Sequence, residues 1–572
     1  MSASSTPSVR AHGLALLPPA RWLSGYQPAW LTGDLIAGVT LAAYAIPVSL
    51  AYATLAGLEP QVGIYGYLLG GLGYALLGSS RQMAVGPTSA ISLMIASTVS
   101  AMAAGDAQRY VEIASLAAFT VAMLCFIAWA LRLSVLVKLI SDSVLVGFKA
   151  GAGITIAMTQ LPSLFGLPGG GHNFIERMIA FAGQIPQTKP LVLLVGIVAI
   201  LALKLGDRFL PGRPVALGVV IVSILAATIL GLPALGVPVT GLIPSGLPAF
   251  HALALRPSDV EGIFPLAGGV LLLAYIEGVS AARAFATKHG YDLDPRQEFL
   301  GLGAANLAVA FGQGYPVAGG LSQSAVNDKA GAHTPLALVF ASLTLGLCLL
   351  FLTGYLENLP KAVLAAVVLT AVAGLINFPA LASMARVSRT DFLAAAIALV
   401  SVLLLGILDG ILLAAVASII LMLLRVSRPH VGFLGRIPGT DLYSDTTRHP
   451  DNEPLPGILA FRPEASLIYV NADEVLDTVL ACVKAGGPTP CRLVVCDLSS
   501  CPMMDLAGVG MLHRLHDDLE KHGIRLRVIG AVGSVRDLLR ADGFSERVEG
   551  VSREVTLGDI VASSFPRNRE SN

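Results

Sequence analysis

Long apolar segments separated by short polar stretches recur over the first 425 residues of the chain. A helix needs about 20 mostly apolar residues to cross the hydrocarbon core of a bilayer, so this pattern predicts a polytopic α-helical membrane protein. The fourteen predicted spans are 34–56, 61–78, 87–103, 110–131, 135–165, 188–204, 214–231, 262–286, 297–314, 321–333, 335–354, 362–378, 390–406 and 408–425. The third and the tenth are short.

Both short spans begin at a Gly-rich break in the helical pattern, VGPTSAIS at residues 85–92 and VAGGLSQS at residues 317–324. In hydrocarbon, non-helical backbone survives only where the protein encloses it or where it lines a cavity. If each break runs into a half-helix, the two helix N-termini present free amides and partial positive charge. The paired breaks therefore predict an anion site between two half-helices.

The loop charges set the topology, because Lys and Arg collect in short cytoplasmic loops. With the N-terminus inside, the predicted inner loops are richer in basic residues, such as Lys138 and Arg213, than the outer loops. An odd seven-span half must enter the membrane in the opposite orientation in the second copy, which predicts inverted repeats over 34–231 and 262–425. Residues 1–33 lack the features of a cleaved signal peptide and are predicted to be a cytoplasmic segment.

Composition confirms the membrane class and separates a second domain. The chain is 55% hydrophobic and 13% charged, with a mean hydropathy of +0.74, whereas about 25% of residues are charged in soluble domains. Of the 37 basic and 37 acidic residues, 34 lie at or after Asp441. We expect a membrane transport domain over 34–428, a linker over 429–455, a soluble domain over 456–562 and a disordered tail over 563–572. The zero net charge and the lack of a long basic tract speak against nucleic-acid binding.

The soluble domain is predicted to alternate strands with helices. An apolar run at 493–498 and the segment 525–529 suit buried strands, whereas 507–521 and 534–539 have helical spacing. This alternation predicts a layered α/β domain. The six cysteines include no C-x-x-C pair, which fits a reduced, cytoplasmic domain.

Several ordered motifs resemble the SulP (sulfate permease) family of anion transporters. The motifs are DLIAG at 34–38 with Ile46-Pro47 and Ala51-Tyr52-Ala53, VGPT at 85–88, GYDLD at 290–294, and YPV at 315–317 leading to SQSAVN at 322–327. The resemblance implies a secondary transporter of sulfate, bicarbonate, chloride or dicarboxylates, with fourteen membrane segments and a cytosolic STAS domain. It also implies a homodimer in the cell (inner) membrane with both termini cytoplasmic.

The breaks supply the candidate substrate ligands. Backbone amides and side-chain hydroxyls at helix N-termini can coordinate an oxyanion. The alternative interpretation is that small residues here only let helices approach closely. The predicted substrate-binding residues are Gly86, Thr88, Ser89, Gly320, Leu321, Ser322, Gln323 and Tyr52.

Two polar residues bear on charge and coupling. Gln323 stands where many SulP relatives have Arg, so the predicted pocket lacks a fixed positive charge and a co-transported cation gains importance. Glu277 lies within an apolar span, where an ionisable side chain costs about 2.5–3.5 kcal/mol and is a functional hypothesis by default. It could bind a proton or attract sodium, or it could be a structural hydrogen-bond acceptor. Asp142 and Lys149 could pair with each other across the fifth span.

The function expected from these features is secondary active transport of a sulfate-type anion by alternating access, coupled to protons. Sodium-dependent bicarbonate uptake and proton-coupled dicarboxylate uptake are the rival substrates. A membrane-anchored STAS receptor that binds an anion without moving it is an alternative of another class. No Walker, HExxH, G-x-S-x-G or zinc-ligand motif appears, so we expect neither an enzyme nor a bound cofactor or metal.

Overall fold

The computed structural model describes residues 22–23, 25–133, 141–171, 173–210, 214–250, 252–253, 256–486, 489–548, 551 and 554–564. Most of the predicted N-terminal segment, most of the predicted C-terminal tail, and the loop residues Lys138 and Arg213 lie outside these ranges. The chain divides into two compact units, residues 1–418 and 419–572, and each is described by itself.

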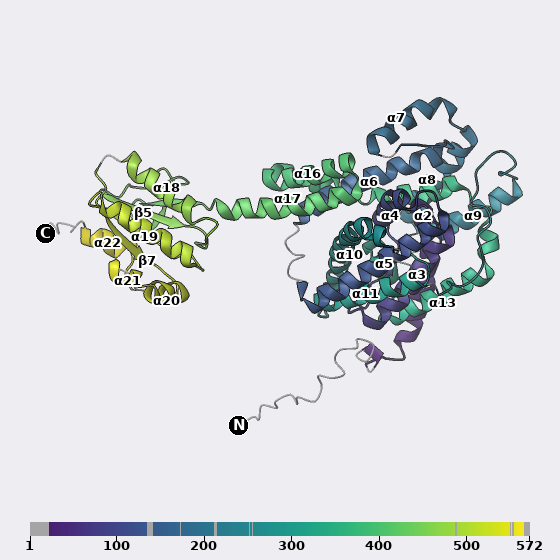
Figure 1. Cartoon of the computed structure of the whole chain (residues 1–572), viewed down its shortest axis with the longest axis horizontal. Helices are drawn as coiled ribbons and strands as arrows, with labels where there is room; N and C mark the ends of the chain where they lie inside the picture. Colours follow the sequence, from purple (N-terminus) through teal and green to yellow (C-terminus); the bar gives the residue numbers. More distant parts are fainter. Residues whose placement is uncertain are drawn as a thin grey trace, which may run out of the picture. The chain divides into compact units, whose positions relative to one another are not determined.

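The first unit is helical (Figure 1), and each of the fourteen predicted spans contains a helix. The spans correspond to α2 (Trp30–Leu55), α3 (Pro60–Leu77), α4 (Ser89–Ala103), α5 (Ala107–Ala130), α6 (Asp142–Phe165), α8 (Pro190–Phe209), α9 (Val215–Ile229), α10 (Val260–His289), α11 (Pro295–Phe311), α12 (Leu321–Lys329), α13 (Leu336–Phe351), α14 (Lys361–Ala373), α16 (Arg389–Leu405) and α17 (Ile407–Ser427). Apolar helices long enough to cross a membrane include α2, α5, α6 and α10.

Two short helices were not expected from the apolar pattern. The helix α7 (Phe174–Gln184) follows α6, and α15 (Phe378–Val387) follows α14. Each begins at an Asn side chain, Asn173 or Asn377, that accepts a hydrogen bond from a first-turn amide. They have 11 and 10 residues, too few to span a bilayer, and neither contains a fully buried residue. Their matching positions in the two halves strengthen the repeat.

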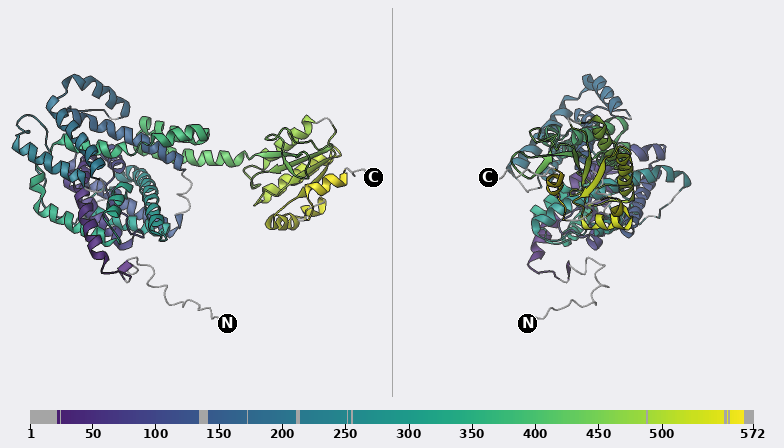
Figure 2. Two further views of the ribbon diagram at one scale, coloured as in Figure 1. Left: turned by 180° about the vertical axis from the view of Figure 1, so that it is seen from behind. Right: turned by 90° about the vertical axis from the view of Figure 1, so that its left-hand side faces the viewer.

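Helix packing shows the same repeat. The helix α5 packs on α11, and the corresponding pair from the other halves, α13 and α3, also packs together. The pairs α6 with α16 and α14 with α8 correspond in the same way. Figure 2 shows the helices of this unit from two further sides, coloured by their place in the sequence. The first unit is therefore built from two inverted seven-span repeats, as the sequence predicts.

The helices form two groups. We call α2–α5 with α10–α13 the core bundle, and α6, α8, α9, α14 and α16 the gate bundle, to which α17 is joined where Gly410 meets Val402 of α16. Glycines permit the closest approaches within each group. A Cβ at Gly38 on α2 would lie 2.5 Å from the carbonyl oxygen of Ala337 on α13, and one at Gly147 on α6 would lie 1.9 Å from that of Ala395 on α16. Only glycine allows backbones this close.

The second unit contains a five-stranded sheet in the order β4-β3-β5-β6-β7. The strands are β3 (Val431–Arg436), β4 (Tyr443–Asp445), β5 (Ile458–Pro463), β6 (Leu493–Asp497) and β7 (Arg525–Ile529). The last three are mutually parallel, and β3 runs antiparallel to both of its neighbours. The prediction of a linker at 429–455 is wrong, because β3 and β4 belong to the sheet. The strand β4 has only three residues and is polar, and two glycines interrupt the apolar run of β3, which hid both strands in the apolar pattern.

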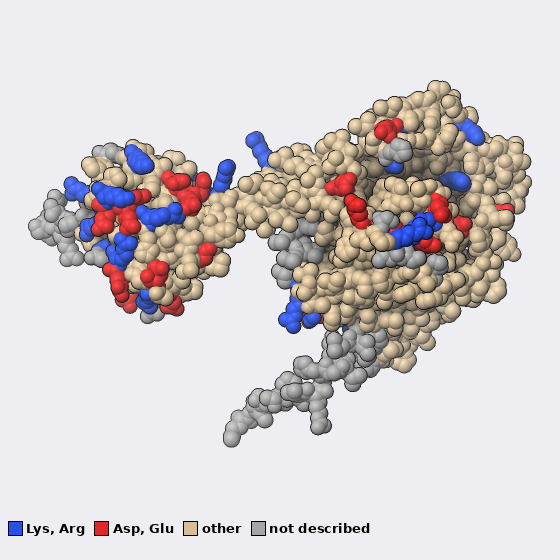
Figure 3. Space-filling view, in the orientation of Figure 1, with Lys and Arg blue, Asp and Glu red and all other residues tan. Residues whose placement is uncertain are grey.

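Both faces of this sheet are covered. The helices α18 (Ala472–Ala485), α19 (Leu506–Glu520), α20 (Gly533–Ala541) and α21 (Phe544–Arg547) contribute to the core on one face. The helix α22 (Leu557–Ser564) packs on the other face. Along β6, Val494 and Cys496 point into the first core and Leu493 and Val495 into the second. In the view of Figure 3, charged side chains crowd this unit, whereas the helical unit shows few.

Candidate anion site

The two Gly-rich breaks meet as a pair of short strands. In β1 (Val85–Gly86) and β2 (Ala318–Gly319), Val85 faces Gly319 and Gly86 faces Ala318 in antiparallel register. Each strand runs directly into a helix, α4 after β1 and α12 after β2. We call this pair of strands the crossing. Because the strands are antiparallel, the two helices start on opposite sides of it. The extended segments and half-helices inferred from the sequence are therefore present.

Side chains satisfy the backbone at the crossing, as irregular backbone in a membrane requires. The Asn306 side chain of α11 accepts a hydrogen bond from the Val317 amide at 3.0 Å and donates one to the Val317 carbonyl at 3.1 Å. The Ser324 hydroxyl accepts from the Ala84 amide at 2.9 Å and donates to the Gly320 carbonyl at 2.7 Å. Side chains of the second half thus hold the strand pair, and Ser324 ties it to Ala84 of the first half.

An aromatic ring packs against position 86 and leaves no room for a side chain there. A Cβ at this position would lie 2.3 Å from ring carbons of Tyr67 on α3, closer than any real contact. The Tyr67 hydroxyl in turn donates to Oε1 of Gln323 on α12. The break in one half is therefore packed against a side chain that binds the break in the other.

The half-helices begin without side-chain caps. Neither Thr88 at the start of α4 nor Gly320 at the start of α12 gives a side-chain cap. Other helices of this unit, such as α2 and α3, also start without one, whereas Asp106 and Asp294 cap α5 and α11. The Thr88 hydroxyl oxygen is buried and has no hydrogen-bond partner among the described residues. Uncapped amides and an unpartnered hydroxyl at two facing helix starts suit a bound anion.

The other predicted ligands divide into accessible and buried groups. Leu321 and Ser322 are exposed at the start of α12. Ser89 is buried at the start of α4, and its hydroxyl interacts with that of buried Tyr52 on α2. Tyr52 also lies within electrostatic range of Glu277 on α10. The structure thus brings the first break, the aromatic residue of the first span and the intramembrane carboxylate together.

Gln323 differs from the other predicted ligands, because the protein already uses its polar atoms. The side chain is 4% exposed, and Nε2 donates to the carbonyls of Ala84 at 3.0 Å and Ala318 at 3.1 Å. Its Oε1 accepts from Tyr67. In this conformation Gln323 fastens the two breaks to each other and has no free donor for an anion.

Glu277 pairs with a cation of another helix. Its Oε1 lies 3.8 Å from Nζ of Lys149 on α6. The alternative pairing of Lys149 with Asp142 does not form, because residues seven positions apart on a helix are separated by about 10 Å along its axis. Asp142 instead lies in the first turn of α6, where a carboxylate suits the helix dipole.

Sequence reasoning missed the residues that support the crossing, namely Tyr67, Asn306 and Ser324. A signal for Asn306 exists, since an amide side chain inside an apolar span must find a partner. No comparable signal marks Tyr67, because an aromatic residue in an apolar span fits ordinary core packing.

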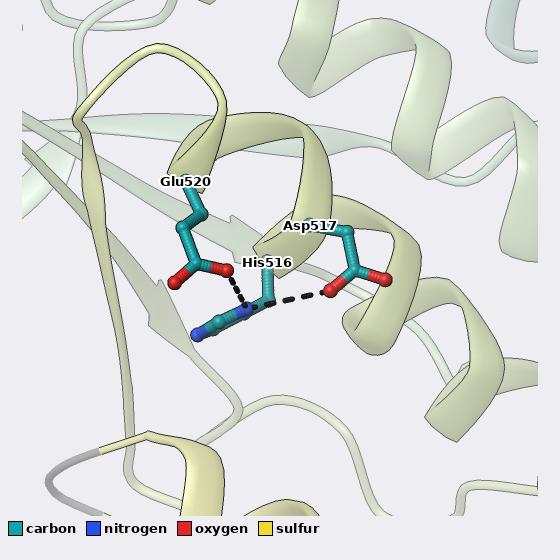
Figure 4. A group of neighbouring side chains, drawn as sticks. All are labelled: His516, Asp517 and Glu520. Carbon is teal, nitrogen blue, oxygen red and sulfur yellow. Dashed lines mark ion pairs between the residues drawn. The ribbon is translucent and has the colours of Figure 1, made fainter.

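A separate cluster of possible metal ligands lies in the second unit (Figure 4), formed by His516, Asp517 and Glu520 of α19. The His516 Nδ1 lies 3.6 Å from an Asp517 oxygen and 3.8 Å from a Glu520 oxygen. The guanidinium of Arg547 donates to the same Asp517 oxygen at 2.6 Å and to His516 Nδ1 at 3.4 Å. Arg547 therefore already supplies the positive charge in this cluster.

Family models match most of the chain. Residues 31–399 match the sulfate permease family, and residues 449–557 match the STAS domain. A Mycobacterium tuberculosis protein named "Probable sulfate transporter" is 32% identical over 525 residues, covering 91% of this chain and 93% of that protein. Sulfate transporter 2.1 of Arabidopsis thaliana is 30% identical over 578 residues, covering 96% of this chain and 85% of that protein.

Solved structures share the fold. The murine anion transporter Solute Carrier 26 family member A9 aligns with a TM-score of 0.86 at 22% identity, over 99% of this chain and 96% of that one. The transmembrane domain of the cyanobacterial bicarbonate transporter BicA aligns with a TM-score of 0.59 at 20% identity, over 69% of this chain and 98% of that one. The chain therefore belongs to the sulfate permease family and is a multi-pass anion transporter with a C-terminal STAS domain, not an enzyme.

Proposed function

We propose that this protein is a secondary active transporter of a sulfate-type oxyanion, driven by a proton gradient. The observation that carries the proposal is the pair of uncapped helix starts at the strand crossing, together with the unpartnered Thr88 hydroxyl. An oxyanion there accepts hydrogen bonds from first-turn amides and from the hydroxyls of Thr88, Ser89 and Ser322. Relatives named sulfate transporters support the choice of substrate class.

Glu277 carries the coupling proton in this proposal. A carboxyl group inside a membrane domain is retained at a cost, which favours a functional role. The Lys149 ammonium lies 3.8 Å from its Oε1, and Tyr52, which lies within electrostatic range of Glu277, interacts with Ser89 of the first break. Occupation of the anion site and protonation of Glu277 can therefore influence each other across one side chain.

Transport proceeds by alternating access. The core bundle holds both breaks and α10, and it moves against the gate bundle to expose the anion to one side of the membrane and then the other. We further propose that the protein lies in the cell (inner) membrane with both termini cytoplasmic and works as a homodimer.

Sodium-dependent bicarbonate transport is the second candidate. It is favoured by Gln323, because a crossing without a fixed cation suits a singly charged anion better than a doubly charged one. Proton-coupled uptake of a dicarboxylate is a third candidate, and the uptake experiment described next distinguishes it from the other two.

The test is uptake of labelled sulfate, bicarbonate and fumarate into proteoliposomes under imposed proton or sodium gradients. We expect saturable sulfate uptake driven by protons, and loss of the coupling in Glu277→Gln. Glu261→Gln is the matched control, because Glu261 is an exposed acid in the first turn of the same helix. Uptake of bicarbonate only, driven by sodium, supports the second candidate. No flux of any anion overturns transport and favours a receptor.

A further inference from the structure

The ion pair between Lys149 and Glu277 is loose. The separation of 3.8 Å between Nζ and Oε1 exceeds the 2.7–2.9 Å of a charge-assisted hydrogen bond. The Lys149 side chain is 32% exposed and that of Glu277 is 17% exposed. The ammonium group is thus attracted to the carboxylate and still has N–H groups to offer to another acceptor.

The pair also joins the two bundles. Lys149 lies on α6, which packs against α14 and α16 of the gate bundle. Glu277 lies on α10, which packs against α4, α5 and β2 of the core bundle. The helix α6 additionally contacts α4, the half-helix that starts at the first break. Lys149 is therefore a gate-bundle cation that pairs with a core-bundle carboxylate, and both of their helices contact the half-helix α4.

The crossing offers less positive charge than a doubly charged anion needs. Each helix N-terminus is equivalent to about half an elementary charge, so α4 and α12 together offset about one negative charge. The predicted ligands at the crossing are neutral, and Gln323 already uses its amide group within the protein. A doubly charged anion thus needs about one further positive charge. The nearest candidate is Lys149, whose Nζ lies 3.8 Å from Glu277 on α10, a helix that packs against α4 and β2.

We propose that Lys149 is a ligand of the transported anion and sets the preference for doubly charged substrates. This inference rests on the proposed function. In the empty site the ammonium group pairs with Glu277, and in the loaded site it turns to the anion. Glu277 is then left without its cation, and a proton from the aqueous phase neutralises it. One anion and one proton thereby enter together, and the gate bundle contacts the cargo that the core bundle carries.

The experiment compares the full-length wild type, Lys149→Gln and Lys149→Arg in proteoliposomes, with labelled sulfate and bicarbonate as probes. We expect Lys149→Gln to raise KM for sulfate at least tenfold and to raise KM for bicarbonate less, and Lys149→Arg to stay near the wild type. Lys189→Gln removes an exposed lysine of the same unit and controls for net charge. If Lys149 has a purely structural role, Lys149→Gln lowers the amount of folded protein and leaves KM unchanged. That result overturns the proposal.

Lys149→Gln leaves Glu277 unpaired, which favours misfolding. A second variant therefore separates misfolding from loss of an anion ligand. Lys149→Gln combined with Glu277→Gln removes both charges and should restore folding while sulfate KM stays raised. A wild-type KM in that double variant overturns the inference.

Sulfate binding separates this inference from the proposed function. If the wild type moves no anion, the proposed function fails. The change in melting temperature on adding sulfate then still tests whether Lys149 binds the anion. A rise in the wild type that is lost in Lys149→Gln supports the assignment. An equal rise in both proteins, or none in the wild type, refutes it.

Discussion

Gln323→Leu is the substitution that best distinguishes two roles of Gln323: a ligand of the anion, or a structural clamp that holds the two breaks together. The sequence suggests Gln323 as a substrate ligand, whereas the structure shows its amide group bound to both breaks. Leucine keeps a side chain of similar size and removes three hydrogen bonds, those to the carbonyls of Ala84 and Ala318 and that from Tyr67.

The expected loss follows from these contacts. A protein hydrogen bond contributes about 1 kcal/mol net, and a buried group left without a partner costs about 1–3 kcal/mol. The Ala84 carbonyl keeps the Gly320 amide as a donor at 3.4 Å, whereas the Tyr67 hydroxyl loses its acceptor. Loss of three bonds gives a destabilisation of about 3 kcal/mol for the membrane unit.

The assay uses tryptophan fluorescence in detergent. The three tryptophans, Trp22, Trp30 and Trp129, all lie in the first unit, so their signal reports on this unit and not on the STAS domain. We expect a lower melting temperature and a lower maximal rate of uptake for Gln323→Leu, with KM nearly unchanged. Ser322→Ala is the matched control, because Ser322 is the exposed neighbour and should change KM without changing the melting temperature.

The opposite pattern would refute the structural role of Gln323. If Gln323→Leu melts like the wild type and raises KM about tenfold, then its amide group binds the anion in the transport cycle, since one hydrogen bond to a charged group contributes about 1.5–3 kcal/mol.

Three further substitutions test other parts of the structure. Gly86→Ala places a Cβ 2.3 Å from the Tyr67 ring, so we expect about 1–3 kcal/mol of destabilisation and loss of uptake, and a wild-type melting curve would contradict this packing. Thr88→Val removes an unpartnered hydroxyl, so the melting temperature should hold while KM rises about tenfold; an unchanged KM would remove Thr88 from the site. Burial would raise the pKa of Asp445 in the STAS unit, but hydrogen bonds from His430 and Thr447 outweigh it and hold the pKa below its usual range. A lowered folded-state pKa stabilises the fold above the unfolded-state value of about 3.9, and this stabilisation is lost as the pH falls below it. Asp445→Asn should therefore flatten the acid side of the STAS unfolding profile, followed by circular dichroism, and an unaltered profile would refute this pair.

The sequence by itself determined the number and order of the spans, the repeat and the position of both breaks. These features follow from local physics, because bilayer thickness fixes the length of an apolar segment and hydrocarbon forbids unsatisfied backbone. It also predicted the alternating strands and helices of the STAS core from the periodicity of apolar residues. It failed at β3 and β4, since neither strand shows such a period, and β3 forms by pairing with β5 while β4 forms by pairing with β3.

Only the tertiary structure decided the partners of the polar side chains. Gln323 and Glu277 are both intramembrane polar residues in the sequence, and nothing local distinguishes a clamp from an ion pair. Tyr67 and Gln323 are 256 positions apart, and Lys149 and Glu277 belong to different helices of different bundles. Such pairings depend on how helices pack, because a buried polar group takes whichever partner the fold brings within reach.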